Sequence, residues 1–299
     1  MPQYKFPQQR NFYMSDLTKA NGAELAELNQ ILGTEVAGGA SNTAIVRVPE
    51  LKINAKSKNK VTKKSIPEGY FYLRGTDQVA YAETVTFRPL ASHIQYFHWD
   101  GEGKERKLKN KSLAVKSVYK DEARDMLGSI ACGMPNWEAR KEMSKEEAKY
   151  WRDMQHRVTR GLVSYEGETE DGEKVVVENQ PCIMFHKNST YSGFYNEVIK
   201  KLPNGSQLYN YEIKLTSSYN ENGSVIWYTY NYEPNLKKEL PLSEDVKATM
   251  RVFADTLRAE NKYIDQKYFE AIKEGSIDSK ATEALKSLGD NLDDDFEAA

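Results

Sequence analysis

The sequence predicts a mainly β protein with inserted helices, an α+β fold that ends in a long helix and a disordered acidic tail. Short segments of alternating apolar and polar residues, rich in Tyr, Val, Ile and Thr, recur between residues 43 and 234. Ser243 can cap a helix in which Val246, Met250, Phe253 and Leu257 follow at steps of four, three and four. The final residues, 275–299, have little hydrophobicity, so we expect them to be disordered.

These patterns divide the chain into four segments. Residues 1–42 are expected to form an N-terminal arm with a short helix, capped by Asn21, and a glycine-rich linker. Residues 43–242 form the core, residues 243–274 the C-terminal helix, and residues 275–299 the acidic tail.

The core is expected to alternate strands with a few helices. Strands are predicted over residues 43–54, 70–74, 79–88, 92–99, 157–168 and 173–187, followed by a hairpin over 207–234 with "NENG" as its turn. Helices are predicted over 119–129, 144–158 and 189–202, the second with a capping box from Ser144 to Glu147. Sparse turns and long insertions disfavour a βαβ pattern. We therefore expect an elaborated, partly open barrel of the oligonucleotide/oligosaccharide-binding (OB) type, with a helical insertion at about 119–158.

The charge distribution is uneven along the chain. The net charge is −2, but residues 275–299 hold seven acids and two lysines, a net of −5. Residues 52–124 hold sixteen Lys or Arg and eight Asp or Glu, a net of +8. A basic middle and an acidic end on one chain favour a polyanionic partner.

The sequence lacks the motifs typical of several enzyme classes and of membrane proteins. The chain has neither a GxxxxGK[ST] loop nor a GxSxG elbow, and no apolar run is long enough to span a membrane. The two cysteines, Cys132 and Cys182, are far apart in sequence, although His186 would share a strand face with Cys182. We therefore predict a cytoplasmic protein that is not an enzyme and has no metal, no cofactor and no membrane association.

Two lysine-rich loops flank an aromatic strand pair. The first contains Lys52, Lys56, Lys58, Lys60, Lys63 and Lys64, and the second contains Lys104, Arg106, Lys107, Lys109 and Lys111. One such loop alone is most simply a solvated surface. Two of them can form a positive rim that neutralises phosphates, if the sheet brings them together.

Alternation divides the aromatic residues of this strand pair between two faces. Phe71, Leu73, Val85 and Phe87 are assigned to the core, whereas Tyr70, Tyr72 and Arg74 face outward and can stack on bases. Further candidates for base contact are Tyr96, Trp99, Tyr228 and Tyr230, with Tyr232 on the same strand face as the last two. For each of these rings, half-buried packing in a sheet is the alternative.

The order of these parts resembles the single-stranded DNA-binding proteins of tailed bacteriophages. The stretch "NQPCIMFHKNSTYSGFYNEVIKKL" (179–202), the hairpin after it and the tail motif "DDDF" (293–296) carry the resemblance most specifically. The resemblance implies an OB fold that coats single strands without sequence preference during replication and recombination, in the cytoplasm of an infected bacterial host. It also implies that the tail competes with DNA and contacts a polymerase, helicase or primase through Asp293, Asp294, Asp295 and Phe296. One branch of that family holds zinc through a His and three clustered Cys, a cluster that this chain lacks.

Three functions stay open on the sequence. The first is single-stranded DNA binding, with self-association through the N-terminal arm as an open option. The second is a metal-dependent nuclease that uses scattered carboxylates. The third is a phage structural or scaffolding protein whose acidic end provides solubility.

Overall fold

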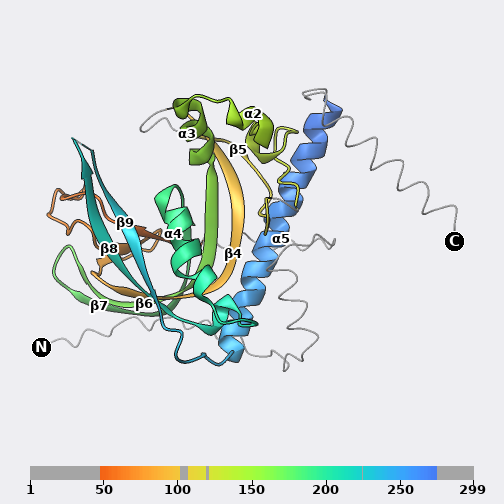
Figure 1. The fold of residues 1–299 in the computed structure, drawn as a ribbon. Coiled ribbons are helices and arrows are strands. Elements are labelled where there is room, and N and C mark those ends of the chain that lie inside the picture. Colours follow the sequence, from red (N-terminus) through yellow and green to blue (C-terminus); the bar gives the residue numbers. More distant parts are fainter. Residues whose placement is uncertain (1–47, 102–106, 119–120, 224, 275–299) are drawn as a thin grey trace, which may run out of the picture.

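The computed structural model describes residues 48–101, 107–118, 121–223 and 225–274. They form one nine-stranded sheet that curls into a half-barrel, with the helix α5 lying along one side (Figure 1). The mainly β class with a long C-terminal helix is therefore confirmed. The predicted N-terminal arm, Lys104, Arg106 and the acidic tail with Asp293–Phe296 lie outside the described residues.

The sheet combines short edge strands with long central ones. Its strands are β1 (Glu50–Ile53), β2 (Phe71–Arg74), β3 (Ala80–Tyr81), β4 (Val85–Asp100), β5 (Lys107–Lys111), β6 (Gln155–Thr169), β7 (Lys174–His186), β8 (Ile213–Asn222) and β9 (Val225–Pro234). Their order is β2-β1-β7-β6-β4-β8-β9, with β3 paired to the end of β6 and β5 to the end of β4. The pair β1–β7 is parallel, and the other pairs between these strands are antiparallel.

The helices are α2 (Trp137–Lys141), α3 (Lys145–Met154), α4 (Ser189–Glu197) and α5 (Glu244–Lys273). Short 3₁₀ turns are η1 (Ala131–Gly133), η2 (Ile199–Lys201) and η3 (Leu208–Asn210). The capping box predicted at Ser144 and the cap predicted at Ser243 are both present. None of the helices in the described part of the chain is long and apolar enough to cross a membrane.

The strand β4 runs through the break that the sequence predicts between residues 88 and 92. Pro89 has no N–H to donate, and the register with β6 shifts between Pro89 and Ala91. Across from it, a Cβ atom on Gly161 would lie 2.3 Å from the Arg88 carbonyl oxygen and 2.7 Å from the Phe87 ring. Glycine is thus required where the two long strands bend and approach closely. The first half of β4 builds the half-barrel core, and its second half packs with the insertion.

The half-barrel core confirms the predicted inward residues. Phe71, Leu73, Val85 and Phe87 are at most 2% exposed and belong to one cluster. The two ends of the sheet meet across this core. The Ser217 hydroxyl of β8 donates to the Gly69 carbonyl at 2.6 Å, and the Phe71 and Tyr230 rings lie 6.0 Å apart.

The helix α5 covers a second core on the other side of the sheet. Val246, Met250, Phe253 and Leu257 are all buried, as their spacing predicts. They pack in a cluster with Leu90, Ala91 and Leu162 from the bend of β4 and β6. The helix is therefore anchored along the middle of the sheet.

The helix predicted over residues 119–129 is wrong. The described part of that segment, 121–129, forms turns and isolated bridges. The Asp125 carboxylate accepts from the backbone N–H of Leu127 at 3.0 Å and of Ser129 at 3.1 Å, which closes a loop. Such side-chain bonds compete with a helical turn. Two other helices are shorter than predicted, because β6 begins at Gln155 and α4 gives way to a 3₁₀ turn at Ile199.

Candidate nucleic-acid interface

The outward face of β2 is partly occupied by the protein's own side chains. Tyr70 and Tyr72 are half-buried, and Arg74 is exposed. The Tyr72 ring lies 5.7 Å from the Tyr81 ring, and burial raises the pKa of Tyr72. Arg74 forms an ion pair with Glu50. Tyr72 and Arg74 alternate with the buried Phe71 and Leu73 as predicted, but both already have a partner on the outward face.

The first lysine loop is fastened to the turn between β6 and β7. The Asn59 amide donates to the Glu170 carboxylate at 2.7 Å, and the Thr62 hydroxyl does so at 2.9 Å. Lys64 pairs with Asp171, which raises the pKa of Lys64. The Lys63 ammonium donates to the Lys60 carbonyl at 2.7 Å. Lys56, Lys58 and Lys60 are exposed, and no carboxylate in the described part of the chain pairs with them.

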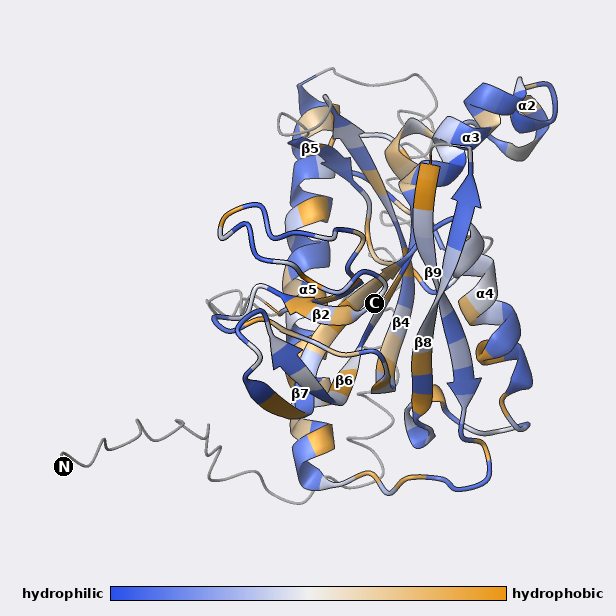
Figure 2. Cartoon of the chain, turned by 90° about the vertical axis from the view of Figure 1, so that its left-hand side faces the viewer, coloured by the Kyte–Doolittle hydropathy of each residue, from blue (hydrophilic) through white to orange (hydrophobic). Residues whose placement is uncertain are grey.

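The second basic segment lies at the other end of the molecule. The strand β5 pairs with β4 at Phe97–Asp100, beside the start of β6, whereas the first lysine loop contacts the turn after the end of β6. Figure 2 shows β5 at the upper end and β2 well below it. Lys107, Lys109 and Lys111, the described cations of the second loop, therefore do not form a joint positive rim with the first lysine loop.

Within this second segment, the lysines have different surroundings. Lys107 and Lys109 are exposed, with Lys109 3.7 Å from Asp100. Lys111 lies mostly inside the protein, where it pairs with Glu260 and sits 5.4 Å from the centre of the Phe97 ring. Burial, with Arg160 close by, lowers the pKa of Lys111 to about 8. Lys111 thus holds α5 to the sheet, and only a small part of its side chain reaches solvent.

Of the remaining predicted aromatic residues, three pack in or against the cores and two keep part of their surface exposed. Tyr96 is 4% exposed and packs with the insertion, so it presents no ring face to a ligand. Tyr230 packs against the half-barrel core, Tyr232 belongs to it, and the Tyr228 hydroxyl donates to Glu68 at 3.2 Å. Trp99 is 40% exposed near β5. We therefore leave Tyr96 and Lys111 out of the proposed interface.

The Cys182 and His186 pair lies inside the half-barrel. Both side chains are fully buried on one face of β7, as the spacing predicts. His186 Nδ1 lies 2.9 Å from the Tyr232 hydroxyl, and burial lowers the pKa of His186 to about 3. Burial also raises the pKa of the Cys182 thiol. Among the described residues, no group of three His, Cys, Asp or Glu side chains is placed to hold a metal ion.

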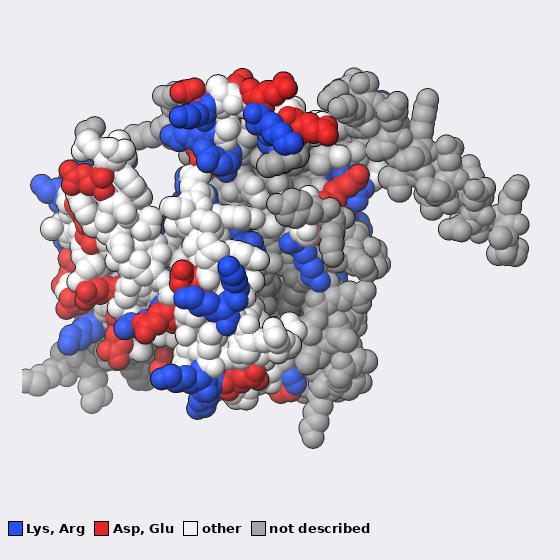
Figure 3. Space-filling model, in the orientation of Figure 1, with Lys and Arg blue, Asp and Glu red and all other residues white. Residues whose placement is uncertain are grey.

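A different basic surface lies over α3. Lys145, Lys149 and Arg152 are spaced at i, i+4 and i+7, which puts them on one face of this helix. All three are exposed, and in the described part of the chain none forms an ion pair with a carboxylate. In Figure 3, Lys and Arg side chains gather at the position that α3 has in Figure 1.

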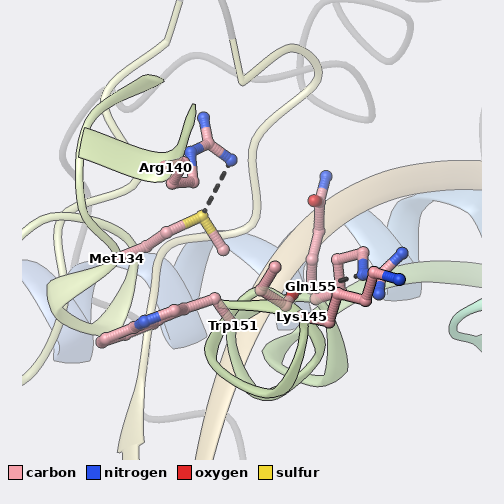
Figure 4. Close-up of a pocket in the computed structure, with 7 residues that line it drawn as sticks. Met134, Arg140, Lys145, Trp151 and Gln155 are labelled. Carbon is pink, nitrogen blue, oxygen red and sulfur yellow. Dashed lines mark hydrogen bonds between the residues drawn. The ribbon is translucent and has the colours of Figure 1, made fainter. Parts of the chain in front are cut away.

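Two adjoining cavities follow this basic face. The first, of about 540 Å³, is lined by Met134, Arg140, Lys145, Ala148, Trp151, Arg152 and Gln155 (Figure 4). The second, of about 640 Å³, is lined by Lys149, Arg152, Gln155, Asn188, Ser189, Tyr191 and Ser192. Because they share Arg152 and Gln155, they adjoin each other, and we call the two together the α3 groove. Among the described residues, its lining includes four basic side chains, two aromatic rings and no carboxylate.

Contacts beneath the α3 groove fix its walls. The Gln155 amide donates to the Tyr191 hydroxyl at 3.2 Å. The guanidinium of the buried Arg157 lies 4.9 Å from the centre of the Tyr191 ring and adds positive charge below the groove. The Arg140 Nη1 atom lies 3.3 Å from the Met134 sulfur. The groove is thus a fixed, cationic surface with aromatic walls.

The sequence contains a signal for this groove that the prediction missed. The basic residues of α3 alternate with Glu146, Glu147 and Asp153, so the helix has no net charge. Only the helical spacing separates the cations onto one face. The partners from α4 come from a segment more than 30 residues away, which sequence spacing cannot reveal.

A comparison of the chain with models of known protein families, with curated proteins and with solved structures finds no match.

Proposed function

We propose that this protein binds single-stranded DNA without sequence preference and has no enzymatic activity of its own. In this proposal the curled sheet is an elaborated OB-like core, and the α3 groove is the main surface for the strand. Lys56, Lys58 and Lys60 add phosphate contacts from the first lysine loop. The setting is phage DNA replication and recombination in the cytoplasm of a bacterial host. The acidic tail, with Asp293–Phe296, contacts replication proteins.

The observation that carries this proposal is the lining of the α3 groove. Four cations without a carboxylate attract a polyanion, and each phosphate that they neutralise releases counterions. Aromatic walls beside those cations suit unpaired bases, because every base has a face that can stack. A groove for a phosphorylated small molecule would share the charge but would not need its open length over α2, α3 and α4.

The first prediction concerns the strength and salt dependence of binding. With about seven phosphates neutralised, four by the α3 groove and three by the first lysine loop, the logarithm of the association constant should fall with the logarithm of salt concentration with a slope of about −5, since each contact contributes about −0.7 for single strands. The measurement is fluorescence anisotropy of a labelled thymidine 25-mer, titrated at several salt concentrations.

Competitors and product analysis complete that experiment. Unlabelled duplex should compete less well than unlabelled single strand. An RNA competitor of the same length shows whether the protein distinguishes ribose from deoxyribose. The oligonucleotide should be recovered intact after incubation with Mg²⁺. Absence of binding at low salt, or cleavage of the strand, would refute the proposed function.

A further inference from the structure

The two halves of the α3 groove differ in chemistry. The first half has Met134, Ala148 and Trp151 as apolar wall, with Arg140 and Lys145 also lining it. The second half has the amide of Asn188 and the hydroxyls of Ser189 and Ser192, with Lys149. Arg152 lines both halves. A ligand that fills the groove therefore has a flat apolar part and a polar anionic part joined beside Arg152.

Trp151 is held in a fixed orientation. Its ring meets the Tyr150 ring edge-on, with centroids 5.2 Å apart and an angle of 78° between the planes. The Tyr150 hydroxyl in turn lies 3.0 Å from His98 Nε2 on β4. Trp151 is half-buried, and part of it packs against the core beside Met154. A ring fixed in this way loses little conformational freedom when a ligand stacks on it.

Met134 lies across the first half of the groove from Trp151. Figure 4 shows the Met134 side chain on one side of the space and the indole of Trp151 on the other, with Lys145 and Gln155 further along. A thioether and an indole both make favourable contacts with an aromatic ring. The volume of about 540 Å³ is ample for one nucleobase.

We propose that the α3 groove binds one nucleotide of the strand as a unit, with its base against Trp151 and its two flanking phosphates on Arg152 and Lys149. This inference rests on the proposed function and assigns to this groove the contact that distinguishes unpaired from paired DNA. A base in a duplex is stacked and paired, so it reaches Trp151 only at the cost of unpairing. The groove thereby selects single strands.

The test separates the base contact from the phosphate contacts. Wild-type protein, Trp151→Ala and Trp151→Phe are titrated with a thymidine 15-mer and with an abasic 15-mer that has the same number of phosphates. Circular dichroism and thermal unfolding establish that the variants are folded. Quenching of intrinsic fluorescence on binding is recorded for wild type and for Trp151→Phe, which keeps the chain's three other tryptophans.

Wild type should bind the thymidine strand about tenfold or more tightly than the abasic strand. Trp151→Ala should remove that difference and leave the affinity for the abasic strand unchanged. Trp151→Phe should keep most of the difference and lose most of the fluorescence quenching.

Two results would overturn the inference while the proposed function stands. One is that Trp151→Ala loses affinity equally for the thymidine strand and the abasic strand, while Trp151→Phe matches wild type in both affinity and fluorescence quenching. That result would make Trp151 a packing residue. The other is that Trp151→Ala retains the full preference for the thymidine strand. If wild type binds neither strand at low salt, the proposed function fails, and this inference fails with it.

Discussion

Replacing Lys145, Lys149 and Arg152 together with glutamine should lower the affinity for single-stranded DNA about a hundredfold at low salt. The three side chains lie on one face of α3 and have no carboxylate partner in the described part of the chain, so their charge is available to phosphates. Removing three phosphate contacts should also make the salt slope shallower by about 2. Anisotropy titrations of the same labelled strand measure both quantities.

A matched control removes the same charge elsewhere. Lys214, Lys237 and Lys238 are exposed and lie outside the groove. Their triple glutamine variant should change the affinity less than about threefold, because only long-range attraction is lost. Equal losses in the two triple variants would mean that net charge, and not the α3 groove, determines binding.

The first lysine loop provides a third arm of that comparison. Replacing Lys56, Lys58 and Lys60 with glutamine should cost less than the groove variant, because Glu170 and Asp171 adjoin the loop and offset its charge. If the loop variant loses more affinity for single-stranded DNA than the groove variant does, the main interface is the first lysine loop, as the sequence predicted, and not the α3 groove.

Replacing Glu260 with glutamine should lower the free energy of unfolding by about 3 kcal/mol. Glu260 on α5 pairs with Lys111 of β5 and with Arg160 of β6, 3.2 Å away. Arg160 is 3% exposed, and Lys111 lies mostly inside the protein. Loss of the carboxylate charge leaves the buried Arg160 and the partly buried Lys111 without their shared partner, and breaking a buried ion pair in this way typically costs about 3–5 kcal/mol. Urea unfolding followed by circular dichroism measures the change.

The matched control is Glu270→Gln on the same helix. Glu270 pairs with Lys267 at 2.7 Å, but both side chains are about 40% exposed. A surface pair of this kind contributes less than about 1 kcal/mol. Similar small losses in both variants would show that the Glu260 network does not anchor α5.

Patterns that depend on local periodicity were predictable from the sequence. The alternation in β2 separates Phe71 and Leu73 from Tyr72, and the structure confirms it. The apolar stripe and the Ser243 cap of α5 follow equally directly. These predictions succeed because two-residue and 3.6-residue periods are properties of the backbone itself.

Features that depend on distant contacts were not predictable. Lys111 and Tyr96 look like surface candidates in sequence, yet Glu260 and the insertion enclose them. The segment 121–129 has a helical composition, but Asp125 binds its own backbone instead. The α3 groove depends on α3 meeting α4, which only the folded sheet arranges.

The measurement that tests the central claim most directly is photo-crosslinking of a halogenated deoxyuridine strand to the full-length protein, followed by mass spectrometry. If the α3 groove is the interface, crosslinks should map to peptides that contain Trp151 and Tyr191, and excess unlabelled single strand should abolish them. Crosslinks confined to residues 56–74 and 225–232, with none in the groove, would contradict the account.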